Sequence, residues 1–223
     1  MFGRLAPRYD FLNRLLSFGL DRWWRRRAVE TLAPRDGGRY LDVGCGTGDV
    51  ALEVLRRTTT GRVVGLDPAP EMLATAAAKA HRLGVADRLE LVLGEACALP
   101  FADGAFDGVT SAFALRSFPD RTMAFAQMRR VLRPGACSAL LELTRPRRAL
   151  VRLGYHVHTR TLGALFAGLV CGTPGPYRFL LRSVDDFPTT DVVGELSTAG
   201  FESATAQPLA GGIATLFVSR APA

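Results

Sequence analysis

The chain has 223 residues, of which 48% are hydrophobic and 22% are charged, and this balance excludes an intrinsically disordered protein. A chain of this length buries a full hydrophobic core, which excludes a bare DNA-binding module and a small disulfide scaffold. The formal net charge is +7, and every basic residue except Lys79 is an arginine. Such a charge suits an anionic partner, either nucleic acid or anionic lipid, although an arginine- and alanine-rich proteome gives the same composition.

The cysteines and the apolar segments bear on the compartment. Cys45, Cys97, Cys137 and Cys171 are widely spaced, with no CxxC pair and no histidine cluster nearby, which argues against a zinc site and against a disulfide framework. The first residues show no signal-peptide pattern, and the longest apolar run, residues 162–172, is too short to cross a bilayer. We therefore expect reduced thiols in a cytoplasmic protein.

The first predicted unit is an N-terminal helical cap over residues 1–36. It carries two arginine-rich stretches, the second of which contains the pair Trp23-Trp24, and the helical pattern breaks at Pro34 and Gly37-Gly38. A tryptophan pair flanked by arginines can dock on an anionic lipid surface. The alternative is a packed amphipathic helix whose arginines extend into solvent.

Beyond the cap, strand and helix patterns alternate as far as residue 143. The predicted strands are residues 39–43, 62–67, 88–92, 106–110 and 137–143, and the predicted helices are residues 49–57, 70–83 and 119–132. Strands separated by helices of this length are typical of a parallel sheet with helices on both faces. The pattern predicts a doubly wound α/β fold.

The C-terminal part departs from this alternation. Residues 145–187, which contain Pro174-Gly175-Pro176, are predicted to form a helical insertion, followed by a helix near 188–199. Strands are predicted near 202–207 and 212–219, and the short link between them leaves no room for a helix, so we expect them to be antiparallel. Residues 1–223 are predicted to form a single domain.

A glycine-rich turn follows the first predicted strand, where the sequence reads Asp42-Val43-Gly44-Cys45-Gly46-Thr47-Gly48-Asp49. Glycines let the backbone approach a ligand closely, and the N-terminus of the next helix favours a carboxylate or phosphate. The spacing is GxGxG and not GxGxxG, which disfavours a nicotinamide cofactor. The alternative is a tight turn with a structural role alone.

Acidic residues follow the next two strands. Asp67 ends the second strand, where a carboxylate can accept both hydroxyls of a ribose, although such a residue can also cap a helix. Glu95 and Ala96 follow the third strand, where a carboxylate and a backbone N–H can meet an adenine ring; the alternative is a surface loop. All these positions lie at carboxyl ends of strands, the edge at which open α/β sheets bind ligands.

Several motifs resemble those of the class I S-adenosylmethionine-dependent methyltransferases, namely residues 41–48, 66–73, 99–101 and 130–135. Within that superfamily the chain resembles the ubiquinone/menaquinone-biosynthesis C-methyltransferases. The segments that carry this narrower resemblance are Tyr9-Asp10, residues 13–20 with Trp24, residues 113–116, 142–146, 177–180 with Ser183, and 209–212. The resemblance is close over residues 1–146 and loose over 147–175.

The resemblance implies a Rossmann-like fold with a seven-stranded, mostly parallel sheet whose last strand is antiparallel, the N-terminal cap, and a substrate-side insertion. It implies S-adenosyl-L-methionine as the cofactor. The cofactor-binding residues that it implies are Asp42, Gly44, Gly46, Thr47, Asp67, Glu95, Ala96 and Ala112. The family pattern has a serine at the position of Ala112, and Ser117 and Arg182 also depart from it, which bears on the substrate more than on the cofactor.

Three residues are candidates for catalysis. Arg116 resembles an arginine in the family's active site, and because a guanidinium is no base at neutral pH we expect it to stabilise a phenolate; the alternative is pairing with Asp120. Tyr9 is expected to close the pocket, unless it is a packed tyrosine. His156 is a candidate base, directly or through water, unless it is a solvated or core histidine.

The resemblance implies C-methylation of a prenylated quinol, in the first place demethylmenaquinol to menaquinol. A secondary-metabolite methyltransferase on the same scaffold, a cofactor-binding scaffold without catalysis and a basic RNA-binding protein are the alternatives, although no nucleic-acid module is visible. A prenylated substrate suggests peripheral contact with anionic lipid at the inner face of the plasma membrane. The ring system, the tail length, the general base and the oligomeric state, a homodimer included, stay open.

Overall fold

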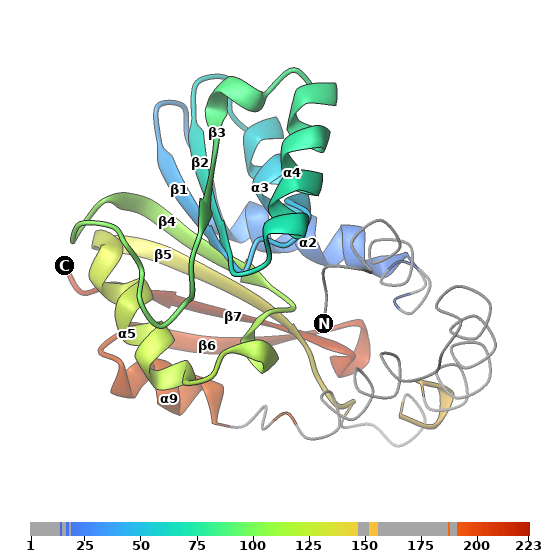
Figure 1. The fold of residues 1–223 in the computed structure, drawn as a ribbon. Helices are drawn as coiled ribbons and strands as arrows, with labels where there is room; N and C mark the ends of the chain where they lie inside the picture. Colours follow the sequence, from blue (N-terminus) through green and yellow to red (C-terminus); the bar gives the residue numbers. More distant parts are fainter. Residues whose placement is uncertain (1–13, 15–16, 18, 147–151, 156–186, 188–190) are drawn as a thin grey trace.

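One seven-stranded sheet organises the chain (Figure 1). The structure, a computed structural model, describes residues 14, 17, 19–146, 152–155, 187 and 191–223. The strands are β1 (Arg39–Val43), β2 (Arg62–Asp67), β3 (Leu89–Leu93), β4 (Phe106–Ala112), β5 (Leu132–Leu143), β6 (Glu202–Leu209) and β7 (Ala214–Arg220). Their order in the sheet is β3-β2-β1-β4-β5-β7-β6.

The direction of the strands confirms the predicted sheet. The pairs among β1 to β5 are parallel, whereas β7 is antiparallel to both of its neighbours, β5 and β6. The chain moves outward from β1 through β2 to β3 and then returns to place β4 on the other side of β1. This reversal creates a crevice at the carboxyl ends of β1 and β4, where doubly wound sheets bind ligands.

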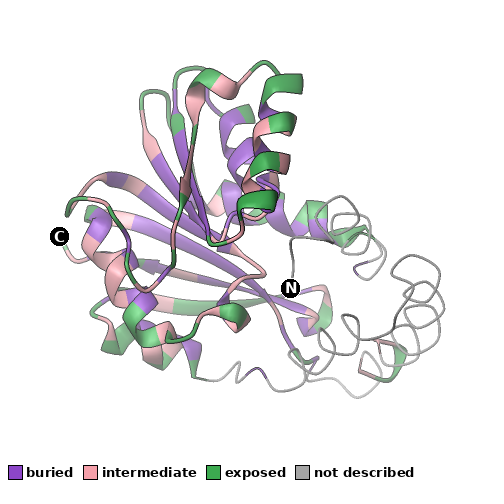
Figure 2. Cartoon of the chain, viewed as in Figure 1, coloured by how far each residue is buried: buried purple, intermediate pink, exposed green. Residues whose placement is uncertain are grey.

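Helices cover both faces of the sheet. The helices are α2 (Leu20–Leu32), α3 (Asp49–Arg56), α4 (Pro70–Arg82), α5 (Arg121–Val131) and α9 (Val192–Thr198). α2, α3 and α4 lie on one face, and α5 and α9 lie on the other (Figure 1). The central strands are buried, and the outward sides of the helices are exposed (Figure 2).

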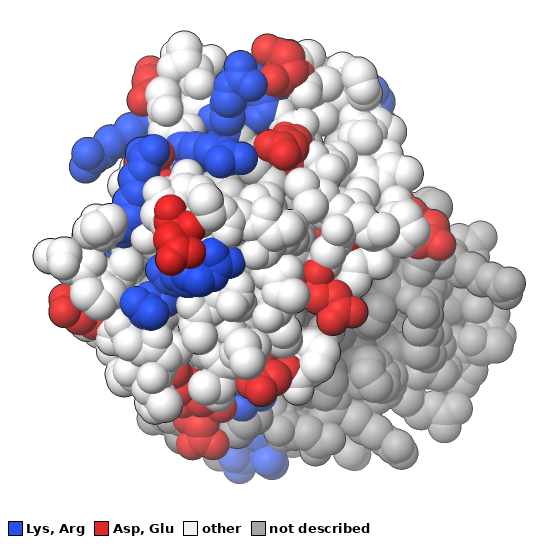
Figure 3. Space-filling view, turned by 60° about the vertical axis from the view of Figure 1, so that its left-hand side comes forward, with Lys and Arg blue, Asp and Glu red and all other residues white. Residues whose placement is uncertain are grey.

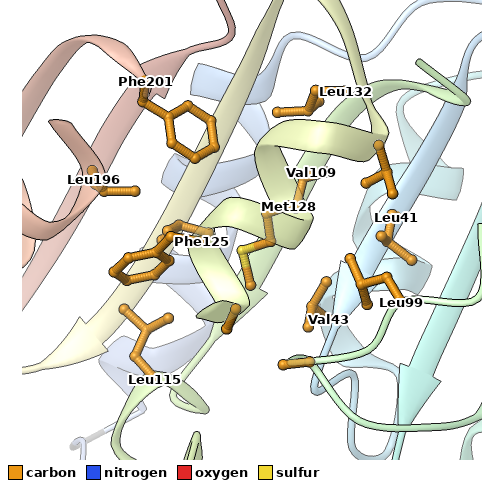
Figure 4. Packing of buried hydrophobic residues seen from close by; sticks show 14 of the residues in the cluster. Leu41, Val43, Leu99, Val109, Leu115, Phe125, Met128, Leu132, Leu196 and Phe201 are labelled. Atoms are coloured by element: carbon orange, nitrogen blue, oxygen red, sulfur yellow. The ribbon is translucent and has the colours of Figure 1, made fainter. Parts of the chain in front are cut away.

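Two hydrophobic cores arise because successive residues of a strand point to opposite faces. Leu41 points toward α5, where it joins Phe125 and Met128 in one cluster (Figure 4). Its neighbour Tyr40 points the other way and joins the cluster of α2 and α3, which contains Trp24. Strands buried on both faces read as continuous apolar runs in the sequence, which is why the alternation of strand and helix was visible there.

The described part of the predicted cap is mainly α2. The two adjacent tryptophans of this helix differ in burial. Trp24 is fully buried and packs edge-on against Phe113, with 6.3 Å between the ring centroids. Trp23 is 49% exposed. The prediction that the two rings dock together on a lipid surface is therefore wrong for Trp24, because its ring belongs to the core.

Some element boundaries differ from the prediction for local reasons. β5 begins at Leu132, opposite Phe106, but its register against β4 then shifts, and regular pairing resumes at Gly108 and Cys137. The predicted strand therefore corresponds to the regularly paired part. α5 begins at Arg121 because the Asp120 side chain caps it, accepting a hydrogen bond from the backbone N–H of Met123 at 2.9 Å.

Candidate active site

An open pocket lies at the carboxyl ends of the central strands, and its cavity volume is about 220 Å³. Its wall comes from the turn after β1, the end of β2, the loop after β3 and the segment after β4. All eight residues predicted to bind the cofactor line it: Asp42, Gly44, Gly46, Thr47, Asp67, Glu95, Ala96 and Ala112. Positions spread over seventy residues of sequence thus meet in one place because their strands are neighbours.

The glycine turn needs glycine at each of its three positions. Gly44, Gly46 and Gly48 have φ of 68°, 54° and 81°, in the left-handed region that other residues avoid. A Cβ on Gly44 would lie 2.6 Å from the Ala114 Cβ, and one on Gly48 would lie 2.9 Å from the Ala76 Cβ. A Cβ on Gly46 would meet no atom within 4 Å, so this part of the turn faces open space.

Asp67 holds the turn against β2. Its Oδ2 accepts a hydrogen bond from the Gly46 N–H at 2.8 Å, and its Oδ1 accepts one from the Ala69 N–H at 2.9 Å. The helix α4 has Ala69 at its N-cap and no side-chain cap, so Asp67 is not the helix cap that the sequence left as an alternative. Burial raises the pKa of Asp67, while the two backbone N–H groups lower it.

Asp42 is the most perturbed acid in the pocket. It is 1% exposed, its Oδ2 accepts a hydrogen bond from the Ala51 N–H at 3.1 Å, and its Oδ1 has no partner among the described residues. Burial raises its pKa to about 8. A buried carboxyl oxygen without a partner, on the wall of a pocket, suits a ligand that brings a hydrogen-bond donor or a positive charge.

The remaining predicted cofactor residues line other parts of the pocket. Glu95 is exposed at the mouth, whereas its neighbour Ala96 is buried. Thr47 is buried, and its Oγ1 accepts a hydrogen bond from the Lys79 Nζ at 2.9 Å. Ala112 ends β4 and begins the part of the wall that follows this strand.

That further part of the wall is apolar and aromatic, and the sequence reading missed most of it. It is formed by Phe113, Ala114, Phe118 and Pro119, with Ser117 as the polar residue of the same segment. Phe113 has φ of 62°, an unusual conformation for a bulky residue and one that is concentrated at functional sites. The arrangement gives the pocket a polar half around the glycines and an apolar half that suits a flat ring.

Arg25 of α2 also lines the pocket, and it was not among the residues predicted to do so. Its guanidinium pairs with Asp21 and lies 5.0 Å from the centroid of the Phe113 ring. A second carboxylate, Asp49, is 3.9 Å away. The i, i+4 spacing of Asp21 and Arg25 was the available signal for a buried pair within one helix.

Arg116 is not among the residues that line the pocket, although Ser117 next to it is, and its side chain is held by a carboxylate that the sequence did not identify. Its Nε donates to the Glu142 Oε1 at 2.8 Å, and its backbone N–H donates to the Glu142 Oε2 at 3.2 Å. The two side chains are 7% and 0% exposed. Asp120, the alternative partner, caps α5, whereas the ion pair given for Arg116 is with Glu142; burial raises the pKa of Glu142 and Arg116 lowers it.

Two predicted catalytic residues, Tyr9 and His156, lie outside the described residues, as does most of the predicted insertion at 145–187. Their roles stay predictions. In the part of the chain that is described, no helix is both long enough and apolar enough to cross a membrane.

Comparison with known sequences identifies relatives along the whole chain. The model of the ubiE/COQ5 methyltransferase family matches residues 1–220. A demethylmenaquinone methyltransferase of Thermus thermophilus is 42% identical over 222 residues, which are 100% of this chain and 100% of the relative. A ubiquinone/menaquinone biosynthesis C-methyltransferase UbiE of Geotalea uraniireducens is 40% identical over 220 residues, covering 98% of this chain and 93% of the relative.

Solved structures share the fold. A SAM-dependent methyltransferase from Aquifex aeolicus superposes with a TM-score of 0.66 at 18% identity, covering 91% of this chain and 92% of that chain. Phosphoethanolamine N-methyltransferase 2 of Haemonchus contortus, in complex with S-adenosyl-L-methionine, gives a TM-score of 0.60 at 16% identity, covering 85% of this chain and 50% of that chain. The chain therefore belongs to the ubiE/COQ5 methyltransferase family, and it is an S-adenosylmethionine-dependent methyltransferase.

Proposed function

We propose that this enzyme methylates a ring carbon of a prenylated quinol, converting demethylmenaquinol to menaquinol with S-adenosylmethionine as the methyl donor. The observation that carries the proposal is the end-to-end match to the Thermus thermophilus relative named demethylmenaquinone methyltransferase. A pocket with a polar half and an apolar half supports it, because the two halves suit a charged cofactor and an aromatic substrate.

The polar half is assigned to the cofactor. Open space beside Gly46 and the unpartnered Oδ1 of Asp42 fit a ligand that carries amino and sulfonium charges. Asp67, already fixed by two backbone N–H groups, keeps lone pairs for ribose hydroxyls, and Glu95 with Ala96 would receive the adenine. When bound, S-adenosylmethionine supplies a methyl group on a positively charged sulfur.

The apolar half is assigned to the quinol ring. Phe113 and Phe118 offer aromatic surface, and Ala114 packs against Gly44 of the glycine turn. Planar rings bind well to such walls through offset or edge-on contacts. The residues therefore orient the ring by shape, and few polar groups are needed on this side.

The chemistry requires one quinol hydroxyl to lose its proton, which gives a phenolate whose ring carbon is nucleophilic. We assign Arg116 to the stabilisation of this negative charge and Glu142 to the positioning of Arg116. A buried and preorganised cation acts more strongly there than it would in water. Tyr9, as the residue that closes the pocket, and His156, as the base directly or through water, remain assigned from the family resemblance.

A prenylated substrate resides in a lipid bilayer, so we also assign the enzyme a peripheral contact with anionic lipid at the inner face of the membrane.

The test is a substrate panel with the purified full-length protein and S-adenosylmethionine carrying a labelled methyl group. We expect label in demethylmenaquinol and slower labelling of the matching demethylated benzoquinol. The variant Gly46→Arg, which fills the open space beside the turn, serves as the control that should transfer no methyl group. Labelling of neither quinol by a folded protein would refute the proposal.

A further inference from the structure

A second pocket, separate from the active site, lies between α2, α3 and α4 and is strongly basic. Among the residues that the structure describes, seven basic side chains and two carboxylates line it. The basic residues are Arg14, Arg22, Arg25, Arg26, Arg56, Lys79 and Arg82, and the carboxylates are Asp49 and Glu53. The chain as a whole carries +7, so much of its excess positive charge is gathered here.

The two carboxylates are already engaged. Asp49 accepts from the Lys79 Nζ at 2.6 Å, and Glu53 pairs with Arg56 at 3.4 Å and with Arg57 at 3.3 Å. Burial alone would raise the pKa of Asp49, yet Arg25 and Lys79 hold it below the ordinary value, so this carboxylate is ionised. The acids therefore neutralise the inner wall of the pocket and leave its outer wall positive.

Three arginines on that outer wall have no acidic partner among the described residues. Arg22 and Arg26 of α2 and Arg82 of α4 are exposed, and none of them has a hydrogen bond or an ion pair with a described residue. Guanidinium groups that converge on one hollow repel one another unless an anion lies between them. Phosphate matches the fork of N–H donors that each guanidinium offers.

Exposed apolar side chains lie beside these arginines. Trp23 is 49% exposed and lies between Arg22 and Arg26 on the outer side of α2, and Leu20 one turn earlier is 36% exposed. Across the pocket, Leu83 is 47% exposed and lines it. Arginines next to an exposed tryptophan and leucines fit the boundary of a bilayer, where phosphates and acyl chains meet.

Another face of the molecule lacks this character. The left-hand side of Figure 1, brought forward in Figure 3, intersperses basic and acidic side chains. The basic pocket also adjoins the active site, because Arg25 and Asp49 line both pockets. A bilayer held against α2 and α4 would therefore lie next to the site that needs a lipid-borne quinol.

We propose that the pocket between α2, α3 and α4 binds the phosphate of an anionic membrane lipid through Arg22, Arg26 and Arg82, with Trp23 and Leu83 inserted beside it. The inference rests on the proposed function only in its choice of a bilayer as the source of the phosphate. It places the docking surface on Trp23 and the arginines and leaves Trp24 in the core.

The experiment is co-sedimentation of the full-length protein with vesicles of phosphatidylcholine, with and without phosphatidylglycerol. We expect binding to the anionic vesicles alone, and binding that weakens as salt rises. The double variant Arg22→Gln/Arg26→Gln should bind about 30-fold more weakly, since each arginine near an anionic surface contributes about fivefold. Arg82→Gln should weaken binding by about fivefold.

The matched control is Arg35→Gln/Arg62→Gln, which removes the same charge from exposed arginines outside the pocket. Equal losses in the two double variants, or equal binding to neutral and anionic vesicles, would overturn the inference. A pocket that instead takes free phosphate or polyuridylate would show variant-sensitive binding of that probe without vesicle binding, which also overturns it.

These readouts need neither quinol nor cofactor, so they do not depend on the proposed reaction. A protein that methylates no quinol but still needs Arg22 and Arg26 for vesicle binding would refute the proposed function and support this inference. A protein that methylates demethylmenaquinol in detergent but does not bind anionic vesicles would support the proposed function and refute this inference.

Discussion

The pair of Arg116 and Glu142 shows how one contact can serve both folding and catalysis. Both side chains are buried, so each ion depends on the other. Removing one partner of a buried pair leaves an unpaired charge and costs about 3–5 kcal/mol. A loss of turnover in a single variant is therefore ambiguous, since it combines the stability of the fold with the stabilisation of a phenolate.

A double variant separates the two contributions. Arg116→Gln should lower kcat by about 10²–10³ and also lower the free energy of unfolding, while cofactor affinity stays nearly unchanged. Arg116→Gln/Glu142→Gln should regain most of the stability, because no charge is left buried, yet stay slow. Denaturant unfolding and steady-state kinetics of the three proteins provide the measurement. Recovery of turnover in the double variant would return Arg116 to a purely structural role.

Asp42 makes stability depend on pH. Its folded pKa of about 8 lies far above the value near 3.9 of an unfolded chain, so between these values the folded state keeps a proton that the unfolded state releases. Stability contributed by this group is then full below about pH 4 and is lost as pH rises toward 8. Asp42→Asn keeps an acceptor for the Ala51 N–H and removes the titration.

We expect the free energy of unfolding of Asp42→Asn to fall less steeply between pH 5 and 8 than that of the wild type, by up to about 1.4 kcal/mol per pH unit. Urea unfolding at three pH values measures these slopes, and Asp87→Asn, at an exposed position, is the control for the change of residue. Parallel slopes for Asp42→Asn and the wild type would show that this carboxyl is ionised in the folded protein.

At the scale of elements, α2 connects the core to the pocket. Its inner side buries Trp24, Ala28 and Leu32, and the Trp24 ring supports Phe113, which lines the active site. Its outer side carries Arg22, Trp23 and Arg26. One helix thus presents a core face and a charged face, because successive residues of a helix are rotated by about 100° around its axis.

This division predicts opposite outcomes for adjacent tryptophans. Trp24→Ala should cost about 3–5 kcal/mol of stability by opening a core cavity, whereas Trp23→Ala should stay within about 0.5 kcal/mol. Trp24→Phe, which keeps an aromatic ring and removes an N–H without a described partner, should lose far less than Trp24→Ala. Thermal and denaturant unfolding measure all three, and equal losses for Trp23→Ala and Trp24→Ala would contradict the division.

At the scale of the whole molecule, the order of the strands creates the site. The sheet reverses between β1 and β4, and the glycine turn, Asp67 and Glu95 all follow strands that end at that edge. The sequence was sufficient to predict this much, because buried strands and glycine turns leave local patterns. The antiparallel last pair was predictable too, since the short link at Gly211-Gly212 has no space for a crossover helix.

What the sequence could not predict depends on contacts between distant segments. Glu142 meets Arg116 only because β5 lies beside β4, and no local pattern selects this acid from the others. The basic pocket combines arginines from helices that are far apart in the chain. The burial of Trp24 could have been predicted from the sequence, because Trp24, Ala28 and Leu32 recur at helical spacing and share one face of the helix.

The proposed reaction transfers the methyl group to a ring carbon of demethylmenaquinol. The most direct measurement uses S-adenosylmethionine with a trideuterated methyl group and locates the label in the isolated product by NMR and mass spectrometry. We expect a CD3 group on the quinol ring carbon, with both oxygens unmethylated. A CD3 group on an oxygen, or transfer only to molecules other than a prenylated quinol, would contradict it.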